Sequence, residues 1–207
     1  MTARPDPEYA HGAMYEDYLG FSFELLDEYC QVLHQAITQV DSQHLILSPQ
    51  LNLDDFPTWS PYLEVYAKYF SIFMINMYPN NWQYGLSPEV VHALTLIHER
   101  TSLPLCVSEW SVPSVDSELY NNPSKEDWSW EDCMQTQAER STQASAVALD
   151  LYNLPFMVGT QWFEWLDVNS TARTANRGLC DSSGNLYENL WNNLTSTQME
   201  IVGYQGY

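Results

Sequence analysis

The chain alternates between segments with a helical pattern of apolar residues and short runs that are apolar throughout. Residues 21–40 repeat apolar side chains at intervals of three and four, which predicts a helix with one apolar face. Residues 44–48 then form an apolar run of strand length, closed by Pro49. The same pair of patterns recurs three times, with helices expected at 60–69, 87–100 and 135–153 and strands at 70–79, 103–110 and 156–165. A final helix is expected at 186–196.

The expected strands are continuous apolar runs, which are typical of parallel strands buried on both faces. Four helix-then-strand units therefore predict an α/β fold with a covered parallel sheet. An open doubly wound sheet and part of a (β/α)8 barrel share this local pattern, so the pattern does not separate them. At 207 residues the chain is expected to be one domain or a piece of a larger one, preceded by an irregular segment at residues 1–20.

The chain is strongly acidic, with 7 lysines and arginines against 27 aspartates and glutamates and a formal net charge of -20. This charge excludes a surface that binds nucleic acid by neutralising phosphates, and it argues against anionic membranes. No apolar stretch is long enough to cross a membrane. The first residues lack the apolar core of a signal peptide, which leaves the location open, since a longer parent protein could still be extracellular.

The four cysteines are widely spaced and include no CxxC pair, so neither a zinc site nor a redox motif is indicated. Cys30 and Cys106 fall inside apolar periodic segments and are expected to be buried as small hydrophobic residues. The sequence also lacks a phosphate-binding loop and a dinucleotide fingerprint. We therefore expect no metal and no organic cofactor.

Polar and aromatic residues gather where the expected strands end. In a (β/α)8 barrel the chemistry lies at the C-terminal ends of the strands and in the loops that follow them. Ring faces that stack on sugar C–H surfaces, amides that bind hydroxyls and a carboxylate near the anomeric carbon are what a saccharide cleft needs. The residues of this kind at the strand ends are Asn52, Asn76, Tyr78, Glu109, Trp110, Gln161 and Trp162.

Five segments follow one another in a recognisable order: DSQHLILSPQLN, FMINMYP, SLPLCVSEWSVP, PFMVGTQWFEWLD and ANRGLCDSSGNLYENL. In this order they resemble the second half of a clan A glycoside hydrolase, the superfamily of retaining (β/α)8 glycosidases. Agarase-like and β-galactosidase-like members are the most similar. The resemblance implies a partial TIM barrel, in which the four expected strands are strands five to eight and residues 21–207 are the C-terminal part of the catalytic domain.

The same resemblance assigns roles at the strand ends. Glu109 matches the catalytic nucleophile, which would form a glycosyl-enzyme intermediate. Tyr78 matches the tyrosine that hydrogen-bonds the nucleophile and orients it. Trp162 matches the tryptophan that floors the subsite of the sugar to be cleaved, whereas Phe163 and Trp165 are expected to be core aromatics.

The resemblance also implies a loop that closes over substrate and contains Asp167, Arg173, Asn176 and Arg177. Arg173 and Arg177 could instead bind an anionic sugar or form ordinary ion pairs. Asn76 and Trp110 are further candidate contacts for a polysaccharide or oligosaccharide substrate, which the resemblance implies to be β-linked and galactan-like.

One part of the family pattern is missing. A retaining mechanism needs a second carboxyl group about 5 Å from the nucleophile, and in this clan it follows an Asn at the end of the fourth strand. No Asn-Glu pair follows a strand-like run before residue 22. The chain is then either a C-terminal fragment or a degenerate half barrel, and the alternative function is a catalytically inactive carbohydrate-binding or structural half barrel. Two strand edges would lack partners, which invites self-association.

Overall fold

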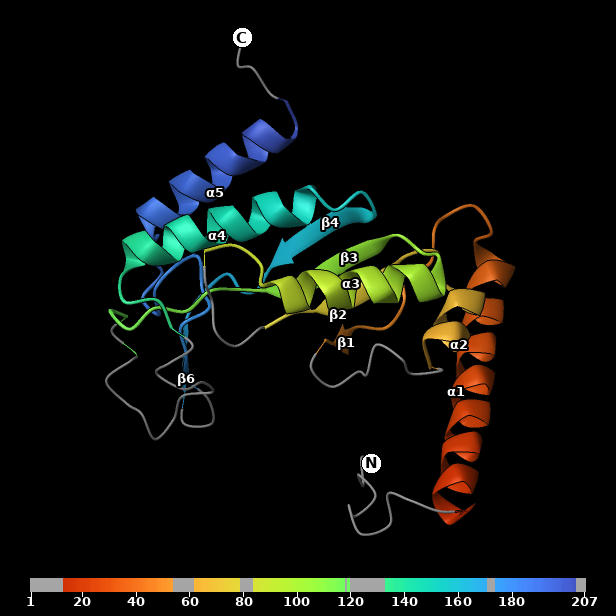
Figure 1. The fold of residues 1–207 in the computed structure, drawn as a ribbon. Coiled ribbons are helices and arrows are strands. Elements are labelled where there is room, and N and C mark those ends of the chain that lie inside the picture. The colour runs from red at the N-terminus through yellow and green to blue at the C-terminus, as the bar shows by residue number, and fades with distance from the viewer. Residues whose placement is uncertain are drawn as a thin grey trace.

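The computed structural model of the protein describes residues 13–53, 62–78, 84–117, 119, 133–170 and 174–203. Its helices are α1 (Ala13–Val40), α2 (Tyr62–Tyr69), α3 (Pro88–Thr101), α4 (Gln137–Tyr152) and α5 (Glu188–Ile201). Its strands are β1 (Leu51–Asn52), β2 (Phe73–Asn76), β3 (Leu105–Trp110), β4 (Met157–Trp162), β5 (Val168–Asn169) and β6 (Thr174–Ala175). Helices and strands alternate along the chain up to β4, as the sequence pattern predicted (Figure 1).

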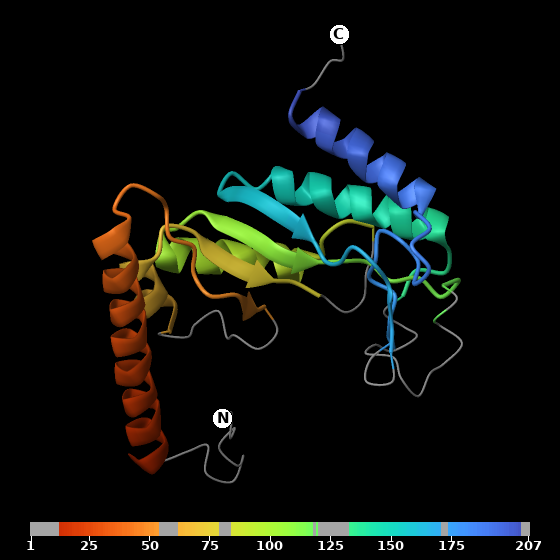
Figure 2. The same ribbon diagram turned by 180° about the vertical axis from the view of Figure 1, so that it is seen from behind.

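Strands β1 to β4 form one parallel sheet in the order β1-β2-β3-β4. A doubly wound sheet reverses its strand order at a switch point, whereas a barrel keeps sequence order. The observed order is therefore compatible with a segment of a (β/α)8 barrel, and the α/β class is confirmed. Helix α3 lies on one face of β2 and β3 in Figure 1, and the opposite face of these strands is turned to the viewer in Figure 2.

The two central strands carry most of the core. In β2, Phe73, Met74 and Ile75 are all buried, and in β3 every residue except Glu109 is buried. They pack against buried residues of the helices, such as Leu94 of α3 and Val147 of α4. Burial on both faces is the reason these runs contain no polar alternation. The four cysteines are free and buried, as expected for Cys30 and Cys106.

Two element boundaries differ from the sequence expectation. Helix α1 begins at Ala13, within the segment expected to be irregular, because a helix interior tolerates Gly20 and Glu16 favours the first turn. The run at 44–48 was expected to be a strand, but it makes only a single parallel bridge, from Leu47 to Ile72, and regular pairing begins at β1. Pro49 has no N–H to donate, which interrupts the ladder between the two.

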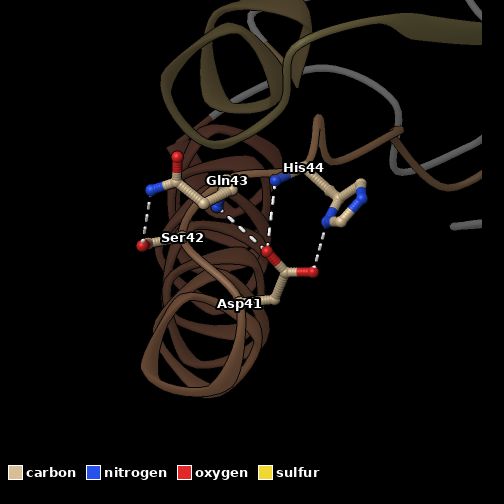
Figure 3. Close-up of polar contacts among 4 residues, drawn as sticks. All are labelled: Asp41, Ser42, Gln43 and His44. Atoms are coloured by element: carbon tan, nitrogen blue, oxygen red, sulfur yellow. Dashed lines mark hydrogen bonds and ion pairs between the residues drawn. The ribbon is translucent and has the colours of Figure 1, made fainter.

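A compact turn links α1 to the sheet. Asp41 Oδ1 accepts hydrogen bonds from the backbone N–H groups of Gln43 and His44, and Oδ2 contacts His44 Nδ1 at 2.5 Å (Figure 3). These bonds satisfy backbone donors just past the helix end and lower the pKa of the Asp41 carboxyl, with the Gln43 N–H as the largest cause. The turn leads the chain toward the bridge at Leu47 and so toward the edge of the sheet.

The sheet has two open flanks. Edge strands β1 and β4 each pair with only one strand among the residues that the structure describes. On one side of the molecule α1 lies beside α2 (Figures 1 and 2) and exposes an apolar stripe of Phe21, Leu25, Tyr29, Val32 and Val40. On the other flank, Val158 in β4 is 58% exposed. None of the described helices is long and apolar enough to span a membrane.

Candidate active site

The C-terminal ends of β2 and β3 bring Tyr78 and Glu109 together. A register shift after Ile75 places Asn76 opposite Glu109, and the backbone N–H of Met77 donates to Glu109 O at 2.8 Å. Tyr78, the next residue, then donates from its hydroxyl to Glu109 Oε2 at 2.9 Å. Both side chains are half-buried. The structure thus forms the pair that the sequence placed at two neighbouring strand ends.

The environment keeps Tyr78 a hydrogen-bond donor. Burial and the hydrogen bond to Glu109 raise the pKa of the Tyr78 phenol well above its ordinary value of 10.0, while Arg177 acts in the opposite direction. A protonated phenol donates to a carboxylate and stabilises its charged, oriented form. Tyr78 therefore holds one oxygen of Glu109 in place at neutral pH.

One aromatic residue that meets Tyr78 is Phe163, which the sequence predicted to lie in the core. The rings of Tyr78 and Phe163 lie 6.4 Å apart at 79°, and Phe163 is half-buried. Arg177 joins them, with its Cζ 4.3 Å from the Tyr78 ring centroid and 6.0 Å from that of Phe163. Together with Glu109, these side chains form the candidate site.

The structure does not bring Trp162 to this pair. Its ring packs edge-on against Trp110 at 5.0 Å, and its indole N–H donates to Arg177 O at 2.9 Å. Trp162 instead lines a cavity of about 310 Å³ between β4 and α5, together with Trp191. Successive residues of an extended chain point to opposite faces, so Phe163 and Trp162 cannot both face Tyr78.

Two further candidates lie inside the protein. Trp110 is 2% exposed, which leaves no ring face for a sugar. Asp167 is 4% exposed and accepts hydrogen bonds from Tyr187 Oη, Asn176 Nδ2 and Gly178 N, at 2.7, 2.7 and 2.6 Å. Burial raises the pKa of this carboxyl, and those bonds oppose the rise. In place of the expected substrate contact, Asp167 and the buried Asn176 organise the loop around them.

Arg140 of α4 completes this buried network, and no role for it was predicted from the sequence. It is fully buried; its Nε donates to Val112 O at 2.5 Å and its Nη2 to Gly178 O at 2.8 Å. Its guanidinium also lies over the ring of Tyr187, at 5.0 Å. Burial lowers its pKa to about 10, although Asp167 opposes this. Within a helix rich in polar residues, no sequence signal separates Arg140 from a surface arginine.

The remaining candidates lie nearer the edge of the site or outside the described chain. Asn76 is half-buried and accepts a hydrogen bond from Ser108 Oγ at 2.8 Å, so it stiffens the strand ends beside Glu109. Asn52 is exposed at the end of β1. Arg173 lies outside the described residues. The described residues contain no group of three His, Cys, Asp or Glu arranged to hold a metal ion.

Comparisons with known proteins point to one class of fold. No protein-family model matches the sequence, and no curated protein matches it either. Among solved structures, an exo-β-agarase matches with a TM-score of 0.72 at 20% identity, over 91% of this chain and 24% of that chain. Another agarase matches with a TM-score of 0.73 at 18% identity, over 94% and 26%.

A Bacteroides uniformis β-glucuronidase is also similar, with a TM-score of 0.55 at 17% identity, over 86% of this chain and 20% of that chain. The chain therefore spans about a quarter or less of the length of these three proteins. At such identities the likeness concerns the fold alone. The chain has the fold of one part of these glycoside hydrolases.

Proposed function

We propose that this chain is the nucleophile-bearing part of a retaining clan A glycoside hydrolase that acts on a β-linked, galactan-like saccharide. In this proposal β1 to β4 correspond to strands five to eight of a (β/α)8 barrel. The observation that carries the proposal is the hydrogen bond from Tyr78 to Glu109 at the ends of two adjacent parallel strands. The fold likeness to two agarases supports the choice of substrate class.

Glu109 would attack the anomeric carbon and form an ester to it, while the bond from that carbon to the leaving oxygen breaks. Tyr78 would orient the attacking carboxylate through its hydrogen bond to Oε2. Phe163 would offer an aromatic face at the same edge of the sheet. The acid that protonates the leaving oxygen would come from outside this chain, from a carboxyl group about 5 Å from Glu109. This mechanism uses no metal and no organic cofactor.

Covalent trapping tests the nucleophile without the missing acid. When a 2-fluoro galactoside carries a dinitrophenolate leaving group, the dinitrophenolate leaves without protonation. The fluorine on the sugar slows hydrolysis of the ester that forms on the protein. We expect the wild-type chain to gain the mass of one fluorosugar on Glu109, as measured by intact mass and peptide mapping. Glu109→Gln is expected to lose labelling, whereas Glu99→Gln, a change of an exposed glutamate on α3, is expected to retain it.

The alternative is a half barrel that binds saccharides without cleaving them. The absence of an Asn-Glu pair after an early strand favours it. In that case galacto-oligosaccharides would bind, as measured by calorimetry, with the same affinity in wild type and Glu109→Gln. A wild-type chain that binds the fluoro galactoside but forms no adduct would rule out the nucleophile role.

A further inference from the structure

We propose that Arg177 is a positioning residue, which acts on Glu109 through Tyr78 and is held in place by the buried network around Arg140 and Asp167. The inference rests on the proposed function, since it takes Glu109 as the nucleophile. It replaces the expectation that Arg177 contacts substrate in a loop that closes over it.

The first observation is the order of the three side chains. The guanidinium of Arg177 lies over the ring of Tyr78, 4.3 Å from its centroid, and the Tyr78 hydroxyl donates to Glu109 Oε2. Through its charge, Arg177 opposes the rise in the pKa of the Tyr78 phenol that burial and Glu109 cause. A cation beside a phenol polarises its O–H group and makes it a stronger donor. Removal of Arg177 should therefore weaken the hydrogen bond from Tyr78 to the Glu109 carboxylate.

The second observation is that hydrogen bonds hold the backbone at the carbonyl of Arg177 and at Gly178. Its carbonyl accepts hydrogen bonds from Trp162 Nε1 at 2.9 Å and from the backbone N–H of Glu164 at 3.0 Å. The next residue, Gly178, donates to Asp167 Oδ1 and accepts from Arg140 Nη2. A loop that closes over substrate would have to move, and these hydrogen bonds hold its backbone in place.

The third observation is steric. A Cβ atom on Gly178 would lie 2.3 Å from both Asp167 N and Cys180 O, which are backbone atoms that cannot move aside cheaply. The backbone therefore packs against its neighbours too closely for any side chain at residue 178. This explains how one loop residue can place its guanidinium over the ring of Tyr78, which follows β2.

A double-mutant cycle on trapping kinetics tests the route through Tyr78. We expect Arg177→Gln to lower the limiting rate of labelling by the fluoro galactoside about tenfold, but by less than about twofold when Tyr78→Phe is already present. The half-saturating concentration should stay unchanged in both backgrounds. Arg177→Lys keeps the charge without the planar stack and should recover part of the rate. Arg100→Gln, which removes an exposed arginine of α3, should have no effect.

The outcomes separate the two roles of Arg177. If Arg177→Gln mainly raises the half-saturating concentration, then Arg177 binds substrate directly and the proposal fails. The same holds if Arg177→Gln lowers the limiting rate of labelling by the same factor with and without the Tyr78 hydroxyl. If Arg177→Gln does not fold, as judged by circular dichroism, Arg177→Lys and Arg177→Met replace it in the same cycle.

A second measurement stands apart from activity. In protein labelled with ¹³C-tyrosine, Tyr78→Phe identifies the Tyr78 Cζ resonance. We expect Arg177→Gln to move this resonance in the same direction as Glu109→Gln, because both weaken the bond between the phenol and the carboxylate, while Arg100→Gln leaves it in place. If the wild type forms no adduct yet Arg177→Gln moves the resonance, the nucleophile proposal fails and the positioning role stands. An unmoved resonance overturns the positioning role.

Discussion

The centre of the sheet is buried and bonded within this chain, whereas its two flanks leave apolar side chains exposed. At the centre, β2 and β3 are buried, and Tyr78, Glu109 and Arg177 are held by hydrogen bonds and ring contacts within the chain. At the flanks, α1 exposes an apolar stripe and β4 exposes Val158 (Figures 1 and 2). The chain therefore organises its own part of the chemistry but leaves much apolar surface unburied.

This difference has a physical consequence. Apolar area that stays in water contributes nothing to folding, whereas each buried leucine of the centre contributes roughly 1.5–3 kcal/mol. Exposed strand edges also present unpaired N–H and C=O groups, which other chains can pair with. The flanks should therefore tolerate substitution, and the centre should not.

The largest effect is expected in the buried network behind the site. Arg140→Met should lower the free energy of unfolding by about 3–5 kcal/mol, because it leaves the buried Asp167 without its counter-charge and two carbonyls without donors. Urea denaturation followed by fluorescence measures this. Arg100→Gln, which breaks the exposed pair with Glu64, should cost no more than about 1 kcal/mol. Equal costs for the two variants would contradict the buried network.

A matched leucine pair tests centre against flank directly. Leu105 of β3 is fully buried and Leu25 of α1 is 56% exposed. Leu105→Ala should lower the free energy of unfolding by about 2–5 kcal/mol, and Leu25→Ala by less than about 1 kcal/mol. Urea denaturation of both variants under the same conditions gives the comparison. A large cost at Leu25 would show that the α1 stripe is covered, for instance by a second copy of the chain.

Self-association through the flanks is the next expectation. Because the chain carries a net charge of -20, repulsion should oppose pairing of its open edges at low salt, and screening should relieve it. We therefore expect light scattering to report a larger mass at high salt than at low salt. The double variant Leu25→Ser/Val32→Ser should remain smaller under the high-salt condition. A monomer at every salt concentration would argue against open edges.

A smaller, pH-dependent effect is expected at Asp167. Its pKa in the folded chain is raised above the ordinary value of 3.8, mainly by burial, so the folded state binds this proton more tightly than the unfolded state does. The stability that protonated Asp167 contributes is therefore fully present below pH 3.8. It is lost as the pH rises through the raised pKa of the folded state. Relative to Asp167→Asn, the wild type should lose unfolding free energy over this window, as measured by urea denaturation at several pH values. A constant difference would contradict the raised pKa.

Much of the central region could be predicted from sequence. The alternation of patterns predicted the helix-strand units, and Tyr78 and Glu109 lie near the ends of two neighbouring apolar runs. Ends of adjacent parallel strands meet at the same edge, so a sequence-level argument can bring two such residues together. Around Leu47 the expected strand is reduced to a single bridge, because Pro49 interrupts the pairing. Local effects of this kind shift the boundaries of elements.

The sequence by itself determined the α/β class and the order of the units, because these depend on periodicity, and its resemblance to clan A glycoside hydrolases singled out Tyr78 and Glu109 among the residues at the strand ends. Only the tertiary structure decided that Phe163, and not Trp162, meets Tyr78, since a step of one residue reverses the face of an extended chain. It also decided that Arg140 is buried and that Asp167 accepts a hydrogen bond from Gly178, the residue after Arg177. Those contacts join residues far apart in the sequence, and no local pattern records which side chains the folded backbone brings together.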